Sequence, residues 1–546
     1  MKDITYDKGT LFDIINKTCE AYPNDIAYEF MGKKNTYHQF QDQILTCAKS
    51  LVKLGVKEDD IVCIAMPNVP QAIIMFYAVN RIGAVCNMIH PLSSEQEMLG
   101  FLNRVNCKTL LIMDQFYDSV RFIRKDTPVT NLIIASVKEV LPLYKKLPYS
   151  LTMGRAIKRI EKNEDIIFWS DFVKLGNEKV VLPITGDRTD KMAVILHSGG
   201  TTGKIKGVCL SNMSINACAT QILAHYPIFR RKDKGLSIMP IFHGNGLVLG
   251  IHLMLKVGVC CILIPRFTPK SYVHDLLKYK CNYMSGVPAL YEKMIEQDEI
   301  QNADLSFLKG VFSGADSLPV ELERKINAFL ISHNATVSVK QGYGMTEGVV
   351  ATTLMPVDST KEGSIGKPLP GVRVKIVEPG TTKEVKSGET GEITFSSATN
   401  MMGYYKDEDE TAITLKKHDD GFTYIHSGDL GKVDNDGYFF FEGRIKRIII
   451  TNGYNVFPLE IENIIAHHEK VDNVCVVGVP DPHRGERVKA CIILKHGVDK
   501  TDATKNELKE YFRKTIARYA VPRDIEFFEE FPKTKVGKVD YQKLIY

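Results

Sequence analysis

The chain has 546 residues, too many for one hydrophobic core, and this length predicts about three structural units. Hydrophobic residues make up 44% and charged residues 25% of the sequence, a balance that excludes a largely disordered chain. A formal net charge of +5 is too small over this length to indicate nucleic-acid binding, and it fits a cytoplasmic protein that handles small anions.

Residues 1–140 alternate apolar, strand-like runs with patterns of helical length, which predicts a parallel α/β sheet. We expect a helix that begins at Leu11 and another over 71–78, with strands over 61–66, 84–88 and 109–113. The N-terminal residues contain no apolar segment of the kind that a signal peptide needs. The twelve cysteines form no CxxC pair and no zinc spacing, so we expect free thiols in the cytoplasm.

Residues 140–185 follow a different pattern, in which basic side chains punctuate Leu and Tyr. Two interpretations remain open. The basic amphipathic pattern fits weak peripheral contact of residues 140–165 with an anionic membrane surface. It also fits a solvated connector between two subdomains.

The rest of the chain returns to α/β alternation and then changes character twice. Over 190–345 we expect strands at 193–196, 235–239, 260–264 and 310–313. His252, Lys256 and Gly258 interrupt the apolar stretch 246–265, so it predicts a buried helix, turn and strand instead of a membrane span. Short runs between Gly and Pro over 360–440 predict a small barrel or sandwich, and the residues after about 450 predict an α+β unit. Its expected helices cover 460–467 and 507–515, and its expected strands cover 474–479 and 490–494.

A Gly- and hydroxyl-rich stretch follows the expected strand at 193–196. Bare backbone N–H groups, hydroxyls and nearby cations are what a phosphate group needs. It is not a Walker A loop, because Lys204 stands where the second glycine would be required. A flexible turn is the alternative. The residues concerned are Ser198, Gly199, Gly200, Thr201, Thr202 and Gly203, with Lys204 and Lys206 as the cations.

Two further polar clusters fit a nucleotide. Tyr343 between Gly342 and Gly344 could stack on a base, Thr346 could meet a phosphate, and Glu347 could hold Mg²⁺, a cation that prefers oxygen ligands. Asp429 could accept hydrogen bonds from both hydroxyls of a ribose. Taken alone, each cluster also fits an ordinary turn.

Together and in this order, the motifs over about residues 196–538 resemble the adenylate-forming superfamily, which includes acyl-CoA synthetases, aryl-acid–CoA ligases, adenylation domains and luciferases. The resemblance implies an α/β fold whose large N-terminal domain, 1–443, has two α/β sheets and a distorted β-barrel at about 355–440. A small mobile α+β domain, 444–546, would follow a hinge at Lys446. The implied small molecules are ATP, Mg²⁺ and CoA.

The resemblance also implies roles for single residues. Ser198 to Gly203 with Lys206 resemble the phosphate loop, and Gly342 to Gly344 resemble the adenine shelf. Thr346 would lie near the α-phosphate, Glu347 would bind Mg²⁺, and Lys538 would assist adenylation. Further matches are Gly314, Ala315 and Asp316 beside adenine and the acyl pocket, Asp429 and Arg444 at the ribose, His243 and Gly244 in the pocket motif, and Lys446, Gly453 and Tyr454 at the hinge and CoA arm.

The sequence departs from the family pattern at several positions. Gly199 lacks a hydroxyl that many relatives have, and Ile205 replaces a usual proline. Arg447 stands where an acidic residue often follows the hinge, and Ile450 stands where some aryl-acid ligases have a lysine. None of these changes removes a charge that carboxylate activation needs, but Ile450 alters the expected contact with CoA.

The implied reaction has two steps: a carboxylate attacks the α-phosphate of ATP to give acyl-AMP and pyrophosphate, and the CoA thiol then displaces AMP. Phe242 and His243 replace the Asp that holds an α-ammonium group, which argues against an amino-acid substrate. His243 could gate the pocket, lie near the incoming thiol or pack in the core. Gly314 and Gly342 leave room for a deep tunnel, which favours a medium- or long-chain fatty acid. An aryl-acid–CoA ligase and an acyl-AMP ligase that loads an acyl carrier protein are alternatives. Glu347 and Lys538 argue against an inactive nucleotide sensor.

Overall fold

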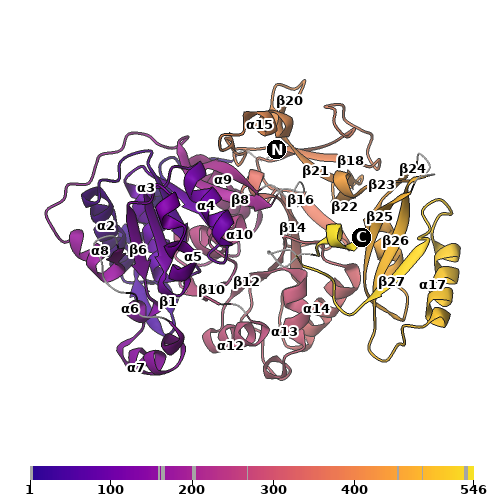
Figure 1. The fold of residues 1–546 in the computed structure, drawn as a ribbon, viewed down its shortest axis with the longest axis horizontal. Helices are drawn as coiled ribbons and strands as arrows, with labels where there is room; N and C mark the ends of the chain where they lie inside the picture. Colours follow the sequence, from indigo (N-terminus) through magenta and orange to yellow (C-terminus); the bar gives the residue numbers. More distant parts are fainter. Residues whose placement is uncertain are drawn as a thin grey trace. The chain divides into compact units, whose positions relative to one another are not determined.

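The first sheet is mixed and has eight strands among the described residues, in the order β19-β9-β8-β4-β3-β5-β6-β7. Its strands β6 and β8 are labelled in Figure 1. The strands from β8 to β7 run parallel, and β9 and β19 run antiparallel at one edge. The strands predicted at 61–66, 84–88, 109–113 and 193–196 are confirmed. Their bounds are β3 Ile61–Ala65, β4 Val85–Met88, β5 Thr109–Met113, β6 Asn131–Ala135, β7 Ile166–Phe168, β8 Met192–Gly199, β9 Ile205–Ser211 and β19 Gly403–Tyr404.

This computed structural model describes residues 4–157, 160, 166–199, 205–266, 268–451, 454–481, 484–533 and 539–545. A second set of strands follows the order β15-β14-β13-β12-β10-β11-β1-β2. The strands from β14 to β1 are parallel, with an antiparallel strand at either end. Their bounds are β1 Ile26–Phe30, β2 Lys33–Thr36, β10 Lys234–Ser237, β11 Cys260–Leu263, β12 Tyr283–Gly286, β13 Gly310–Ser313, β14 Val339–Tyr343 and β15 Thr353–Leu354.

Helices accompany both sheets, and local sequence signals start many of them. Thr10, Thr36, Ser94 and Ser211 each form a capping box, in which the hydroxyl accepts a hydrogen bond from the backbone N–H three residues later. The helices are α1 Leu11–Ala21, α2 Tyr37–Lys53, α3 Pro70–Arg81, α4 Glu95–Arg104, α5 Tyr117–Arg121, α6 Val137–Val140, α7 Leu143–Leu151, α8 Trp169–Leu175, α9 Asn212–His225, α10 Gly244–Leu247, α11 Leu253–Lys256, α12 Pro269–Tyr279, α13 Pro288–Ile295, α14 Val320–Ser332 and α15 Glu408–Thr414.

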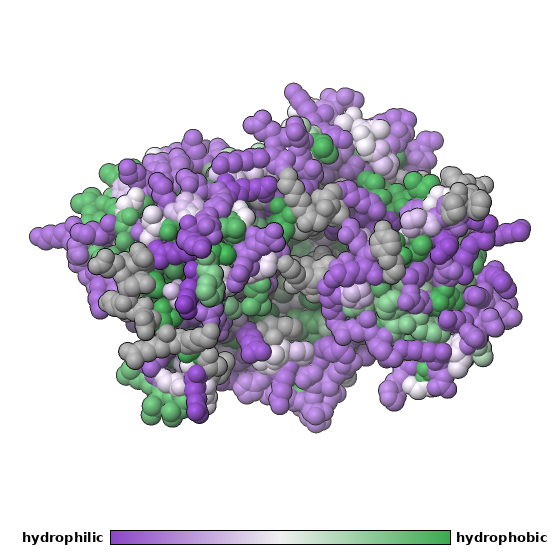
Figure 2. All heavy atoms as spheres, in the orientation of Figure 1, coloured by the Kyte–Doolittle hydropathy of each residue, from purple (hydrophilic) through white to green (hydrophobic). Residues whose placement is uncertain are grey.

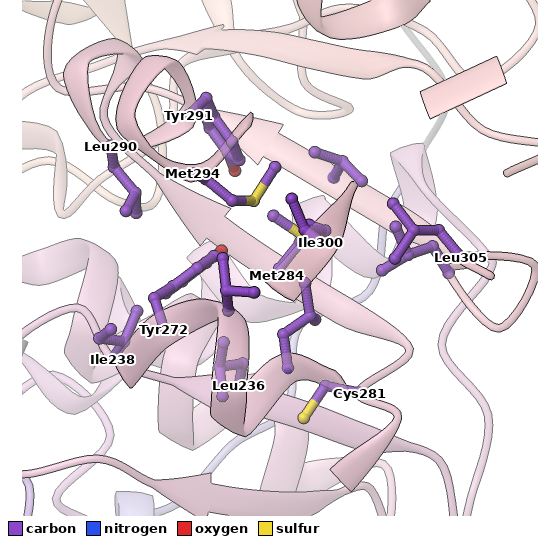
Figure 3. Packing of buried hydrophobic residues seen from close by; sticks show 14 of the residues in the cluster. Leu236, Ile238, Tyr272, Cys281, Met284, Leu290, Tyr291, Met294, Ile300 and Leu305 are labelled. Atoms are coloured by element: carbon purple, nitrogen blue, oxygen red, sulfur yellow. The ribbon is translucent and has the colours of Figure 1, made fainter. Parts of the chain in front are cut away.

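The core beside β10, β12 and β13 shows how helices α12 and α13 attach to the second sheet (Figure 3). Tyr272 of α12 and Tyr291 of α13 are fully buried, with Met284 of β12 and Met294 of α13 in the same cluster. The Tyr291 hydroxyl donates to the carbonyl oxygen of Phe312 at 2.6 Å, which satisfies its polar end. This packing fixes β13, whose carboxyl end bears Gly314.

The apolar stretch 246–265 forms a helix, a turn and a strand, as predicted: α10, the π-helical turn Val248–His252, α11 and then β11. His252 is fully buried and hydrogen-bonds to the Tyr77 hydroxyl at 3.0 Å and to the Asn216 amide oxygen at 2.9 Å. No helix among the described residues is long and apolar enough to cross a membrane.

All twelve cysteines belong to the described part of the chain, and all are buried and free.

Residues 166–175 form β7 and α8, at the edge of the first sheet. The idea that the whole segment 140–185 is a solvated connector is therefore wrong for this half, because Trp169 and Phe172 are buried. The preceding residues form α6, α7 and the short 3₁₀ helix Met153–Ala156.

The chain divides into two compact units. Unit 1 comprises Met1–Glu362, Gly366–Arg373 and Phe395–Ile425, and unit 2 comprises Gly363–Ile365, Val374–Thr394 and His426–Tyr546. The region predicted as a barrel contains strands of 2 to 11 residues and helix α15, and it contributes to both units. A closed barrel and a domain boundary at 443/444 remain predictions. The strands are β16 Ser364–Pro368, β17 Arg373–Val377, β18 Gly391–Ser396, β20 Leu415–Lys417, β21 Thr423–Val433 and β22 Phe439–Arg444.

The C-terminal part of unit 2 is a smaller α+β domain, so the fold is α/β with a large N-terminal and a smaller C-terminal domain. Its sheet has the order β24-β23-β26-β25, with β27 parallel to β26. The predicted helices and strands are confirmed, with bounds β23 Ile449–Thr451, β24 Tyr454–Val456, α16 Pro458–Ala466, β25 Val471–Asp481, β26 Gly485–Leu494, α17 Asp502–Thr515 and β27 Asp524–Phe528.

Candidate functional site

Glu347 is the centre of a buried polar cluster in unit 1. It lies in the 3₁₀ turn Thr346–Gly348 after β14 and is 4% exposed. Its Oε1 accepts hydrogen bonds from the Ser198 hydroxyl at 3.2 Å and the Tyr404 hydroxyl at 2.8 Å. Burial, with the nearby Glu347 carboxylate, raises the pKa of Tyr404, which therefore stays a protonated donor. Three segments far apart in the sequence thus meet at one carboxylate.

Lys206, the predicted phosphate cation, lies on β9, and Ser198 is its partner on β8. Its ammonium group forms an ion pair with Glu410 of α15 and lies 4.9 Å from the centre of the Tyr404 ring. Tyr404 and Glu410 were missed in the sequence analysis. The sequence does show the Gly403-Tyr404 pair followed by the acidic start of a helix. Nothing in the sequence links this pair or this helix to Lys206, because no known motif spacing connects them.

The predicted pocket residues His243 and Gly244 lie beside the turn that holds Glu347. A Cβ atom on Gly244 would lie 1.9 Å from the Val349 carbonyl oxygen, so only glycine allows this approach. Val349 has a φ of 73°, a strained value for a β-branched residue. His243 is half-buried, and its ring centre lies 4.8 Å from that of Phe242.

Asn68 fixes the loop that leads to His243. Its amide NH₂ donates to the carbonyl oxygens of Ser237 at 3.0 Å and Met239 at 2.8 Å. Its amide oxygen accepts from the backbone N–H of Ile241 at 2.8 Å. Asn68 is 2% exposed and follows β3, so the first sheet positions a loop of the second. No sequence signal singled it out.

The carboxyl ends of β13 and β14 bring the predicted adenine residues together. Ser313 and Gln341 are register partners there, and Gly314 to Asp316 and Gly342 to Gly344 continue from them. Among the described residues, the buried Ser313 hydroxyl and Gln341 amide oxygen have no hydrogen-bond partner. Ala315 has a left-handed φ of 67°. Carboxyl ends of parallel strands are where α/β folds bind ligands.

Unit 2 contains the predicted ribose pair. Asp429 and Arg444 are register partners on β21 and β22, and the Arg444 Nε lies 3.2 Å from Asp429 Oδ1. Glu392 supports the turn before Asp429, because it accepts hydrogen bonds from His426 at 2.9 Å and from the backbone N–H of Gly428 at 3.0 Å. Burial alone would raise the pKa of Glu392, but these hydrogen bonds hold it below its usual value.

The predicted hinge lies in the 3₁₀ turn Ile445–Arg447, where Lys446 is exposed. Arg447, which differs from the family pattern at this position, instead points into unit 2. Its guanidinium group lies 2.5 Å from Glu462, donates to the Val476 carbonyl at 3.2 Å and lies 5.1 Å from the Tyr541 ring centre. Arg447 therefore ties the end of the hinge turn to α16, β25 and the C-terminal segment.

Several predicted residues lie outside the described residues: Gly200, Thr201, Thr202, Gly203, Lys204, Gly453 and Lys538. Tyr454 belongs to β24, and its side chain is also outside that description. Gly199 ends β8 and is paired with Ile205. Within the part of the chain that is described, no group of three or more His, Cys, Asp or Glu side chains could hold a metal ion by itself.

Comparison with known proteins adds independent information. Residues 15–405 match the family model described as AMP-binding enzyme, and residues 460–538 match that of the AMP-binding enzyme C-terminal domain. A long-chain-fatty-acid–CoA ligase of Bacillus subtilis (strain 168) is 32% identical over 539 residues, which cover 98% of this chain and 94% of that protein. A probable 4-coumarate–CoA ligase of Dictyostelium discoideum is 31% identical, covering 93% of this chain and 89% of that protein. The crystal structure of ATP-bound MatB from Rhodopseudomonas palustris superposes with a TM-score of 0.84 at 24% identity, covering 99% of this chain and 98% of that one.

Proposed function

This chain belongs to the AMP-binding enzyme family, of the adenylate-forming acyl-CoA synthetase type, and from this premise we propose that it joins a medium- or long-chain fatty acid to CoA through acyl-AMP. The observation that carries the proposal is the buried Glu347 carboxylate, held by the Ser198 and Tyr404 hydroxyls next to the strand that leads into the Gly- and Thr-rich loop. A negative charge beside the phosphate loop attracts the cation that accompanies a nucleoside triphosphate.

Magnesium fits these residues. Mg²⁺ usually takes one or two protein carboxylates and completes its shell with substrate phosphates and water. A single buried carboxylate beside a phosphate loop matches that preference, whereas a closed protein cage would need more ligands. Glu347 would hold the ion, which when bound neutralises phosphate charge.

In the first half-reaction, different residues of the chain would bind different parts of ATP. Ser198 and the loop after it bind the phosphates, and Tyr343 stacks on the adenine ring. Asp429 and Arg444 hold the ribose. Thr346 and Lys538 donate to the α-phosphate region, where an incoming carboxylate would otherwise meet like charge. In the second half-reaction the CoA thiol displaces AMP.

Lys538 gives the sharpest test. Lys538→Ala should abolish carboxylate-dependent ATP–pyrophosphate exchange but spare thioester formation from supplied acyl-AMP. Lys533→Ala, which removes an exposed lysine on the same segment, is the matched control and should leave both half-reactions unchanged. Equal loss of both half-reactions in Lys538→Ala would contradict the assigned role.

The acyl group is tested with a panel of acids in a pyrophosphate-release assay. A Cβ atom on Gly314 would meet nothing closer than the Gly342 carbonyl oxygen at 3.4 Å, so the backbone here has room for a side chain to begin. Gly314→Val should lower kcat/KM for long acids and leave short acids less affected. Strong wild-type activity on benzoates or cinnamates alone would favour the aryl-acid alternative.

The thiol acceptor needs its own assay. The purified protein is offered CoA and a phosphopantetheinyl carrier protein under the same conditions, and we expect thioester on CoA. Product on the carrier protein alone would favour the acyl-AMP ligase alternative.

A further inference from the structure

Lys206, the predicted phosphate cation, has a carboxylate partner in this structure. Its side chain is 11% exposed, and its ammonium group forms an ion pair with Glu410 of α15. An ammonium group with so little access to water needs a counter-ion, because burial removes the water that would otherwise solvate its charge. Glu410 supplies that counter-ion.

Contacts within unit 1 hold Glu410 at this position. Strand β19 precedes α15 and pairs with β9, the strand that carries Lys206. The Thr411 hydroxyl accepts a hydrogen bond from the backbone N–H of Tyr404 on β19 at 2.8 Å, and it donates to the Asp407 carbonyl oxygen at 2.7 Å. Thr411 thus fastens the start of α15 to β19, and its neighbour Glu410 reaches Lys206 from there.

The two members of the ion pair differ in their access to solvent. The Glu410 side chain is 31% exposed, more than that of Lys206. The two residues before it, Glu408 and Asp409, are exposed, and the surface is mostly hydrophilic (Figure 2) where α15 lies near the top of Figure 1. The Glu410 carboxylate can therefore leave the pair and be solvated by water, while Lys206 stays within the protein.

A phosphate group that binds Lys206 meets this carboxylate. Glu410 and a phosphate oxygen are both anions, and two anions on one ammonium group repel each other, since like charges at about 4 Å cost free energy even near a protein surface. The ring of Tyr404, whose centre lies 4.9 Å from the ammonium nitrogen, covers a further side of the cation. Phosphate and the Glu410 carboxylate therefore compete for Lys206.

We propose that Glu410 sets the affinity of this site for triphosphate, because phosphate oxygens bind Lys206 only after they displace the Glu410 carboxylate. The proposal rests on the proposed function, since it takes Lys206 as the phosphate cation. It differs from a positioning role, in which Glu410 would hold Lys206 in the orientation that ATP needs. The two roles predict effects of opposite sign when the charge of Glu410 is removed.

Glu410→Gln tests the proposal, because the amide keeps the shape of the side chain and loses its charge. Two quantities are measured with the full-length protein: the Kd of inorganic triphosphate by isothermal titration calorimetry, and KM for ATP with Mg²⁺ in acid-dependent pyrophosphate release. We expect both to fall by about five-fold, which corresponds to one partly exposed ion pair. The gain should appear in KM and not in kcat, since the displaced carboxylate takes no part in the chemical step.

Two further variants serve as controls. Glu408→Gln removes the same charge from an exposed position on the same helix and should leave Kd and KM unchanged, because solvent and salt screen that charge. In a Lys206→Gln background, Glu410→Gln should no longer lower the Kd of triphosphate, because the coupling needs both partners. Trp169 is the only tryptophan and is buried in α8 of unit 1, so its fluorescence shows that each variant is folded.

The proposal is overturned if Kd and KM stay the same in Glu410→Gln, or if they rise, which would assign the positioning role to Glu410. An equal fall in Glu408→Gln would also contradict it, because the effect would then belong to the net charge of α15. Wild-type protein that binds no triphosphate would contradict it as well. Wild-type protein that binds triphosphate but releases no pyrophosphate with any acid would contradict the proposed ligase activity, and the comparison of Kd values would still decide the role of Glu410.

Discussion

In unit 1 the buried carboxylate Glu347 receives its hydrogen bonds from two hydroxyl groups, whereas in unit 2 Asp429 and Glu462 each face an arginine. Among the residues that the structure describes, no ion pair involves Glu347. A carboxylate held by neutral donors keeps its charge available for a cation, while an ion-paired one mainly positions its partner. In our proposal, the difference separates a carboxylate whose charge can meet a cation from carboxylates whose charge an arginine already matches.

Glu347→Gln tests this comparison with the largest expected effect. The amide keeps the size of the side chain and an acceptor oxygen but loses the charge. We expect kcat/KM for acid-dependent pyrophosphate release to fall by about 10²–10³-fold, the typical loss when one charge-stabilising group is removed. Glu362→Gln, which changes an exposed glutamate paired with Arg324, should leave kcat/KM unchanged. A loss smaller than about ten-fold would contradict a charge role for Glu347.

Arg447→Met tests the other side of the comparison. It leaves Glu462 with no guanidinium partner, and we expect unit 2 to lose about 2–3 kcal/mol of stability, as for other partly buried ion pairs. Hydrogen exchange of β25 and β26 measures the loss. Because the double variant Arg447→Met, Glu462→Met removes both charges, it should regain most of the stability. A single variant as stable as the wild type would show that the pair is not needed.

Acidification should weaken unit 1 through two buried histidines. Burial lowers the pKa of His197 to about 4 and that of His252 to about 3, while Arg104 and Lys256 add smaller shifts in the same direction. The unfolded chain binds these protons near pH 6.5, so the folded state loses stability as pH falls below that value. Each histidine contributes about 1.4 kcal/mol per pH unit, or about 2 kcal/mol between pH 7 and 5.

Denaturant unfolding at pH 7 and pH 5, with Trp169 fluorescence as the probe, measures this pH effect on the stability of unit 1. His197→Asn should reduce the difference between the two pH values. His38→Gln, at an exposed position, should leave the difference unchanged. If the wild type unfolds at the same midpoint denaturant concentration at both pH values, the prediction is wrong.

Tyr404→Phe should have the smallest effect. It removes one hydroxyl donor from Glu347, keeps the ring beside Lys206, and leaves the Ser198 hydrogen bond in place. We expect a loss of about 1 kcal/mol, seen as roughly a five-fold lower kcat/KM for pyrophosphate release. Tyr511→Phe, which removes a hydroxyl bonded to the Ile464 carbonyl in unit 2, is the control. A loss as large as that of Glu347→Gln would mean that the hydroxyl, not the carboxylate charge, is essential.

Much of the fold could be predicted from the sequence because its signals are local. The apolar strand 61–65, the helix after Thr10 and the helix–turn–strand over 246–265 all follow from periodicity, caps and chain length. Candidate residues on separate motifs, such as Ser198 and Glu347, were also found from their residue types. Neither interpretation of the segment 140–185 included the strand and helix over 166–175, because β7 is short and its place at a sheet edge has no local signal.

The sequence by itself determined the α/β class, the order of the elements and the family, since each depends on residues near one another in the chain or on ordered motifs. Only the tertiary structure decided that Tyr404 meets Glu347 across 57 residues and that Glu410 holds Lys206 across 204. It also decided that the leucines of α7 face solvent, while the Met31 carbonyl oxygen holds Lys145 on the inner side of the helix. Such outcomes depend on which surfaces the folded chain brings together, and no single stretch of residues specifies that.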